Sequence, residues 1–231
     1  MSPATPDIPK TEIAIVELTN AFRKELKLGE VKPNAELTQA ARSYAEFLAR
    51  TGLFSHTADG RQPADRVKSA GYAYCLTLEN LAMHLDSYGF KTRQLASQSV
   101  EGWKNSPGHR RNMLAEHVTD IGVAIAKSRT EERYYSVQLF GRPRSFTYKF
   151  KVTNGAGVPV RYSVSGEAVD IPPRMIISHA ACTPGEVAFE RAGAKGAGQT
   201  VGARYPTRDG DHFVLRLERD GRVRVDHEPG G

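Results

Sequence analysis

The chain has 231 residues, a formal net charge of +6 and a pI near 9.3. Its hydrophobic content of 39% and charged content of 25% are typical of a globular protein, and no apolar run approaches the ~20 residues that span a bilayer. Lys and Arg are interleaved with Asp and Glu, and the one dense basic cluster, His109-Arg110-Arg111, is too short for a nucleic-acid footprint. We therefore expect no transmembrane segment and no nucleic-acid partner.

Residues 1–9 include Met-Ser-Pro-Ala-Thr-Pro, a run of small residues and proline that is typical of a flexible segment. No basic region followed by an apolar stretch is present, so we expect the leader to be absent from this chain. Such a start is common just past a cleaved leader or a lipid anchor. It predicts an extracellular or periplasmic protein.

Residues 10–142 combine helical patterns with two later strand patterns, which predicts an α+β domain. Apolar residues recur at three- and four-residue steps in the helical stretches. The predicted helices lie at 9–28, between the N-cap Asn34 and Gly52, near 64–69, at about 91–104 with Leu95, Ser99, Val100 and Trp103 inward, and from Pro107 to Leu114. Two runs rich in β-branched and aromatic residues, Ile121–Ala126 and Tyr134–Phe140, predict strands.

After Gly141-Arg142-Pro143-Arg144 the pattern changes to strict alternation, in which Phe146, Tyr148, Phe150 and Val152 alternate with Thr147, Lys149 and Lys151. This change predicts a second domain over 146–231, a small antiparallel β-sandwich. Its further strands are expected at 160–164, Met175–Ser178, Val187–Glu190, Phe213–Glu218 and Val223–Asp226, with turns at Asn154–Gly157 and Asp220-Gly221 and a Gly/Ala loop at 192–202.

Two cysteines, one in each predicted domain, allow a single disulfide and exclude a cysteine-rich scaffold. An interdomain bridge between Cys75 and Cys182, two buried thiols, and an unpaired surface thiol all remain open at this stage.

None of the common catalytic or metal-binding motifs is present: there is no His-Glu-x-x-His, no Cys-x-x-Cys, no glycine-rich phosphate loop and no Gly-x-Ser-x-Gly. Local context singles out other histidines and glutamates. The segments are Phe54-Ser55-His56-Thr57 after a helix end, Leu78-Glu79-Asn80-Leu81-Ala82 in a turn-rich region, Val100-Glu101-Gly102-Trp103, and Ser106-Pro107-Gly108-His109-Arg110-Arg111-Asn112-Met113-Leu114.

With these segments in this order, the chain resembles the CAP superfamily (the SCP domain of cysteine-rich secretory, antigen 5 and pathogenesis-related class 1 proteins), in its bacterial form. The resemblance covers about 10–142, from Thr19-Asn20-Ala21-Phe22-Arg23 to Tyr135-Ser136-Val137-Gln138-Leu139-Phe140-Gly141. It implies an α-β-α sandwich with a central antiparallel sheet and a cleft tetrad of His56, Glu79, Glu101 and His109. Two departures are Leu78, where the family usually has glycine, and a longer stretch between His56 and Glu79.

The chemistry of these side chains supports a site. Neutral imidazoles bind zinc or copper, and a carboxylate on the second ring nitrogen fixes the tautomer. Two histidines, His56 and His109, would leave coordination positions open; without metal, the same groups could serve as an acid/base pair. We expect Zn²⁺ or another divalent metal as the only cofactor, and no organic one.

Alternative interpretations apply to several residues. The two cleft histidines could be structural, and Glu101 could be a solvated helix residue. His84, His117, His179, His212 and His227 are expected on the surface or in turns. Ser106 is more typical of a helix cap than of a nucleophile, and Asp59 and Arg66 are expected to order a loop.

Three functions compete. The first is an exported binding module with a small-molecule, lipid or cell-envelope ligand in the cleft and a protein partner at the C-terminal domain. The second is a metal-dependent hydrolase, peptidase-like, with Glu79 or Glu101 as the base. The third is a structural envelope protein in which the tetrad only supports the fold.

Overall fold

The computed structural model of the chain describes all residues except 1–2, 190–198, 201 and 231. These residues form two compact units, Met1–Ser145 and Phe146–Gly231. A single turn of 3-10 helix, Arg144–Phe146, lies at the division. Among the helices of the described part, none is long and apolar enough to cross a membrane.

The helices of the first unit begin and end at residues suited to those positions. The Asn34 side chain accepts the Leu37 amide at 2.9 Å as N-cap of α2, and Gly52 ends that helix with a left-handed φ of +73°. The helices are α1 (Ile8–Glu25), α2 (Ala35–Thr51), α3 (Pro63–Ser69), α4 (Thr92–Asn105) and α5 (Pro107–Met113). The predicted helices are therefore confirmed, and the inward stripe of α4 is buried.

The sheet of the first unit has four strands in the order β1-β3-β4-β2. They are β1 (Lys32–Pro33), β2 (Tyr74–Leu85), β3 (Asp120–Lys127) and β4 (Arg133–Pro143). All neighbours are antiparallel except the short β1, which runs parallel to β3. The turn-rich assignment of Glu79-Asn80-Leu81-Ala82 is wrong, because these residues lie within β2. Glu79, Asn80 and Leu81 are buried in succession, so the strand lacks the alternation that reveals a half-exposed strand.

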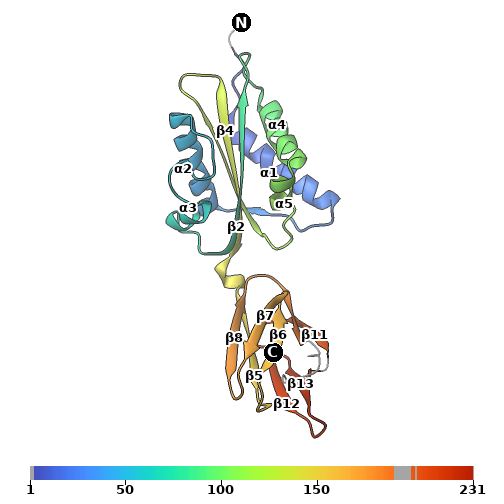
Figure 1. Ribbon diagram of the computed structural model, residues 1–231. Coiled ribbons are helices and arrows are strands. Elements are labelled where there is room, and N and C mark those ends of the chain that lie inside the picture. Colours follow the sequence, from blue (N-terminus) through green and yellow to red (C-terminus); the bar gives the residue numbers. More distant parts are fainter. Residues whose placement is uncertain (1–2, 190–198, 201, 231) are drawn as a thin grey trace. The chain divides into compact units, whose positions relative to one another are not determined.

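Helices cover both faces of this sheet (Figure 1), which confirms the α-β-α sandwich. One core cluster joins α1, α4 and α5 to Ile121, Val123 and Phe140, and the other joins α2 and α3 to Val137 and Leu139. Helix α2 approaches β3 so closely that a Cβ at Gly122 would lie 2.3 Å from the Leu37 carbonyl carbon. Only glycine fits at this contact.

The second unit consists of two sheets, in the orders β10-β13-β12-β5-β8 and β11-β9-β6-β7. Its strands are β5 (Tyr148–Asn154), β6 (Val160–Val164), β7 (Glu167–Ile171), β8 (Ile176–Ala181), β9 (Gly185–Phe189), β10 (Gln199–Thr200), β11 (Ala203–Thr207), β12 (His212–Leu217) and β13 (Arg222–Glu228). Aromatic residues from both sheets meet in one core, with the rings of Phe189 and Phe213 5.8 Å apart. This packing confirms the predicted sandwich.

The strand connections differ from the simplest expectation. Asn154–Gly157 links β5 to β6 in different sheets, so it is not a hairpin. The pairs β5–β12 and β10–β13 are parallel, whereas the other pairs of this unit are antiparallel. The Asp220-Gly221 turn is confirmed, with Gly221 at a φ of +80° between β12 and β13. The predicted loop at 192–202 falls mostly on 192–198 and 201, outside the described residues.

Neither Cys75 nor Cys182 is a free thiol, because both are disulfide-bonded. This finding excludes the two alternatives with free cysteines.

Candidate functional site

The first histidine of the predicted tetrad is hydrogen-bonded to the first glutamate. His56 lies in the turn after α2, and its Nδ1 is 2.8 Å from Glu79 Oε1 on β2. The His56 side chain is 49% exposed, whereas that of Glu79 is 1% exposed. Because a carboxylate oxygen only accepts, Nδ1 carries the proton of this bond, and in the neutral ring Nε2 keeps its lone pair. His56 therefore offers a free ring nitrogen at the border between core and solvent.

Arg66 of α3 fixes the position of Glu79. Its Nη2 lies 3.0 Å from Glu79 Oε1 and 2.8 Å from Oε2, and it also donates to the His56 carbonyl at 2.9 Å. The guanidinium is buried and lies 3.5 Å above the Tyr44 ring. A buried carboxylate needs such a partner, because water cannot compensate its charge there. Arg66 thus supplies the counter-charge that makes the His56–Glu79 hydrogen bond possible.

The segment around Asp59 holds Arg66 in turn. Arg66 Nη1 donates to Asp59 Oδ1 at 2.9 Å and to the Arg61 carbonyl at 3.0 Å. Burial alone would raise the pKa of Asp59, but hydrogen bonds from Arg61 and the charge of Arg66 outweigh it and hold that pKa below its usual value. The sequence assigned Asp59 and Arg66 to loop ordering and missed the bonds from Arg66 to Glu79. The Asp-Gly-Arg…Asp-Arg stretch was the available signal.

The second histidine, His109, lies on α5 with its ring centroid 6.4 Å from that of His56. Burial, and then the charge of His56, lower the pKa of the His109 imidazole below its ordinary value. Helix α5 is tied to β2 by Asn112, whose side chain donates to the Glu79 carbonyl at 3.0 Å and to Asn80 Oδ1 at 2.9 Å. The Asn80 side chain donates to the His109 carbonyl at 3.1 Å. These bonds fix the helix that carries His109 beside the strand that carries Glu79.

A chain of buried amides extends from this point into the core. Asn80 donates to Gln138 Oε1 at 2.9 Å, and Gln138 donates to Thr19 Oγ1 at 2.9 Å. Thr19 completes the chain by donating to the Ile15 carbonyl at 2.7 Å. All three side chains are fully buried and hydrogen-bonded, so they specify how β2, β4 and α1 pack. Sequence analysis assigned no role to Gln138 or Asn112, because single polar residues carry no pattern.

Glu101, the fourth predicted member, lies on the exposed side of α4. Its side chain is 59% exposed and pairs with Lys104 Nζ at 2.9 Å. Within the described part of the chain, we find no contact between Glu101 and the two histidines or Glu79. The structure brings His56, Glu79 and His109 together, and the participation of Glu101 stays a prediction.

The fit of a metal ion rests on the two imidazoles. No group of three or more His, Cys, Asp or Glu side chains arranged to hold a metal occurs among the described residues. Zinc binds imidazole nitrogen at about 2.0–2.1 Å, so two rings on one tetrahedral ion have centroids about 5 Å apart. The observed 6.4 Å requires His56 and His109 to approach by roughly 1 Å. The donor set fits an open, labile site with two protein ligands, in which Glu79 orients His56 and is not itself a ligand.

Three of the five remaining histidines were wrongly expected on the surface or in turns. His84, in β2, packs edge-on against Phe90 with its Nε2 3.1 Å from Ser99 Oγ. His179 and His227 lie in strands of the second unit and stack on Phe150 and Phe213. These three rings contribute to packing.

Residues 16–140, more than half of the chain, match the sequence profile of the CAP family, described as the cysteine-rich secretory protein family. The chain belongs to this family. Its CAP domain is 32% identical over 118 residues to the uncharacterized protein YkwD of Bacillus subtilis, covering 51% of this chain and 43% of YkwD. It is 26% identical over 133 residues to the uncharacterized membrane protein YlbC of the same organism, covering 57% of this chain and 35% of YlbC. The chain thus spans less than half the length of either relative.

Among solved structures, the CAP domain is similar to an outer surface protein from Borrelia burgdorferi. The TM-score is 0.52 at 24% identity, and the match covers 58% of this chain and 94% of the Borrelia protein. This likeness concerns the fold.

Proposed function

We propose that the chain is an exported CAP-domain binding protein in which His56 and His109 hold a divalent metal ion, such as zinc, at a cleft that accepts a further ligand. When bound, the metal would supply open coordination positions to an electron-donating group of that ligand. The protein's contribution is to orient His56 through Glu79 and Arg66 and to place His109 opposite it.

The orientation of His56 supports this proposal most strongly. Its Nδ1 is committed to a buried carboxylate, so only Nε2 is available for binding, and the side chain as a whole is 49% exposed. Histidines that bind metals are commonly oriented by such a carboxylate.

The same geometry favours binding over hydrolysis. Glu79 Oε1 accepts from both His56 and Arg66, Oε2 accepts from Arg66, and the side chain is 1% exposed, so the carboxylate is held by the protein and shielded from water. The other candidate base, Glu101, pairs with Lys104. A general base must reach the proton that it removes, and neither glutamate is arranged to do so.

Export is supported on independent grounds. The matched family is described as secretory, and the similar Borrelia protein is named an outer surface protein. Disulfides persist mainly in oxidising compartments, and both cysteines of this chain are disulfide-bonded.

Calorimetric titration of zinc into metal-stripped protein near neutral pH tests the metal site. We expect about one site per chain in the wild type and none in the His56→Ala/His109→Ala variant. The matched control, His117→Ala/His212→Ala, also keeps five of the seven histidines (7 − 2) and should bind as the wild type does. Equal binding by both double variants would contradict the proposal.

A further inference from the structure

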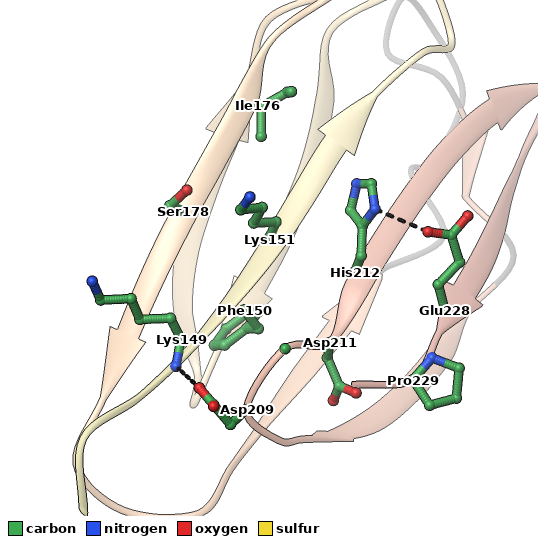
Figure 2. A pocket seen from close by; sticks show the side chains of 11 residues that line it. Lys149, Phe150, Lys151, Ile176, Ser178, Asp209, Asp211, His212, Glu228 and Pro229 are labelled. Atoms are coloured by element: carbon green, nitrogen blue, oxygen red, sulfur yellow. Dashed lines mark hydrogen bonds and ion pairs between the residues drawn. The ribbon is translucent and has the colours of Figure 1, made fainter. Parts of the chain in front are cut away.

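The second unit contains a pocket of about 560 Å³ on the outer face of its five-stranded sheet. Strands β5, β8 and β12 line it, together with the turn at 209–211 and the end of β13 (Figure 2). The pocket belongs to the second unit alone, so nothing about it rests on the function proposed for the cleft.

A row of four polar residues crosses four neighbouring strands of this face. Lys151 is paired in register with Ser178 on one side and with His212 on the other, and His212 is paired with Glu228. Lys149 lies two residues before Lys151 and therefore on the same face. The residue between them, Phe150, points into the core. Both lysines and Ser178 are exposed.

The carboxylates of the pocket are already bound to other groups of the protein. Asp209 Oδ1 accepts the Lys149 amide at 2.7 Å. Asp211 is buried and accepts the Gly230 amide at 3.0 Å and the Arg208 amide at 2.8 Å. These bonds also fix the turn at 209–211, which forms one wall of the pocket.

His212 is committed at both ring nitrogens. Its Nδ1 lies 3.0 Å from Glu228 Oε2, and its Nε2 lies 2.7 Å from Thr153 Oγ1. The first of these contacts is drawn in Figure 2. Since His212 stands between Lys151 and Glu228, the lysine is two strand spacings, about 9.6 Å, from that carboxylate at the backbone. The hydrogen-bond partner of the Glu228 carboxylate is therefore the imidazole and not Lys151.

In the described ranges of the chain, the two lysines of the pocket are its unpaired cations. Neither Lys149 nor Lys151 forms an ion pair with any residue that the structure describes, and the Ser178 hydroxyl has no hydrogen-bond partner there. The Cα atoms of the two lysines lie about 6.6–6.8 Å apart along the strand, and their flexible side chains can converge on one anion. Ile176, at the rim of the pocket, is 59% exposed and offers an apolar contact.

We infer that this pocket binds the phosphate group of a small organic ligand. Lys149 and Lys151 pair with the phosphate oxygens, Ser178 donates a hydrogen bond, and the organic part contacts Ile176. Lysine is a common point-charge partner of phosphate. A volume of about 560 Å³ lies in the range of small-molecule sites and far exceeds that of a phosphate ion.

The first test is an NMR titration of the full ¹⁵N-labelled chain with glycerol 3-phosphate, at an ionic strength of about 0.15 M so that general charge effects are screened. We expect saturable shifts of amides in β5, in β8 and at 209–212. Lys149→Gln/Lys151→Gln should weaken binding at least about tenfold, the effect of ~1.4 kcal/mol. Retained spectra elsewhere would show that this variant is folded.

A matched control removes the same charge from the same unit. Arg204→Gln/Arg219→Gln changes two exposed arginines outside the pocket and should bind as the wild type does. An equal loss in both double variants would show a response to net charge alone and would overturn the inference.

Co-sedimentation with phosphatidylglycerol vesicles, against phosphatidylcholine vesicles, distinguishes a lipid headgroup from a soluble phosphate ester. Binding that depends on Lys149 and Lys151 supports the inference in either experiment and names the source of the phosphate. No lysine-dependent binding to glycerol 3-phosphate or to the anionic vesicles overturns it.

Discussion

Replacing Arg66 with methionine should strongly destabilise the first unit. Arg66 and Glu79 have side-chain exposures of 3% and 1%, so the variant leaves a buried carboxylate without its counter-charge. Breaking a buried pair in this way costs about 3–5 kcal/mol, whereas an exposed pair contributes about 0–1 kcal/mol. The expected loss in the free energy of unfolding is therefore about 3–5 kcal/mol.

Denaturant unfolding followed by tryptophan fluorescence measures this loss in the correct unit. Trp103 is the only tryptophan of the chain and is buried in the first unit, so its signal avoids averaging over a two-unit protein. Arg61→Met is the control within the same cluster, because the Arg61 side chain is 50% exposed in its pair with Asp59. It should cost less than about 1 kcal/mol.

The double variant Arg66→Met/Glu79→Leu distinguishes the loss of the Arg66–Glu79 interaction from the cost of leaving an unpaired charge buried. With Glu79 no longer left as an unpaired buried charge, and with Asp59 still paired with Arg61, it should be more stable than Arg66→Met alone. A cost below about 1 kcal/mol for Arg66→Met, or a double variant no more stable than the single one, would refute the reasoning.

Three further predictions concern the same unit. Gly122→Ala should destabilise the first unit by about 1–3 kcal/mol or more, because the new methyl group meets the α2 backbone. Gly102→Ala, in open space on α4, should stabilise the unit by up to about 1 kcal/mol. Equal effects of the two substitutions in denaturant unfolding would contradict this prediction. Burial lowers the pKa of His84 from 6.5. The unfolded chain therefore takes up this proton first, and stability falls as the pH drops below about 6.5. His84→Gln should reduce that fall in stability, and an NMR titration placing the His84 pKa at or above 6.5 would exclude the mechanism. Glu79→Gln should weaken zinc binding by about 10–100-fold, while Glu101→Gln leaves it within about twofold, and calorimetry showing the reverse would assign Glu101 to the site.

The helical half of the first unit could be predicted because its signals are local. Asn34 and Gly52 mark the ends of α2, and the inward stripe of α4 repeats with the helical period. Strand β2 was missed because three consecutive buried residues, two of them the polar Glu79 and Asn80, interrupt its alternation. The pairing of Arg66 with Glu79 was not predicted, because Glu79 lies 13 residues away in the chain. Burial of both Arg66 and the adjacent Val67 also leaves no alternation that would mark Arg66.

In the second unit, the alternation of β5 predicts its strand and its inner face, but not its neighbours. The partners of Lys151 come from β8 and β12, and His212 lies 61 residues further along the chain (212 − 151). Such pairings are set by packing of the whole sandwich. The row of four polar residues across the sheet therefore could not be predicted from the sequence.

The most direct test of the proposed cleft is the state of the His56 ring nitrogens, read from long-range ¹H–¹⁵N NMR spectra near neutral pH. We predict that the neutral His56 ring is the tautomer protonated at Nδ1, and that one equivalent of zinc shifts the Nε2 signal of His56 together with a ring nitrogen of His109. A neutral His56 ring protonated at Nε2, or zinc shifts confined to other histidines, would contradict this account of the site.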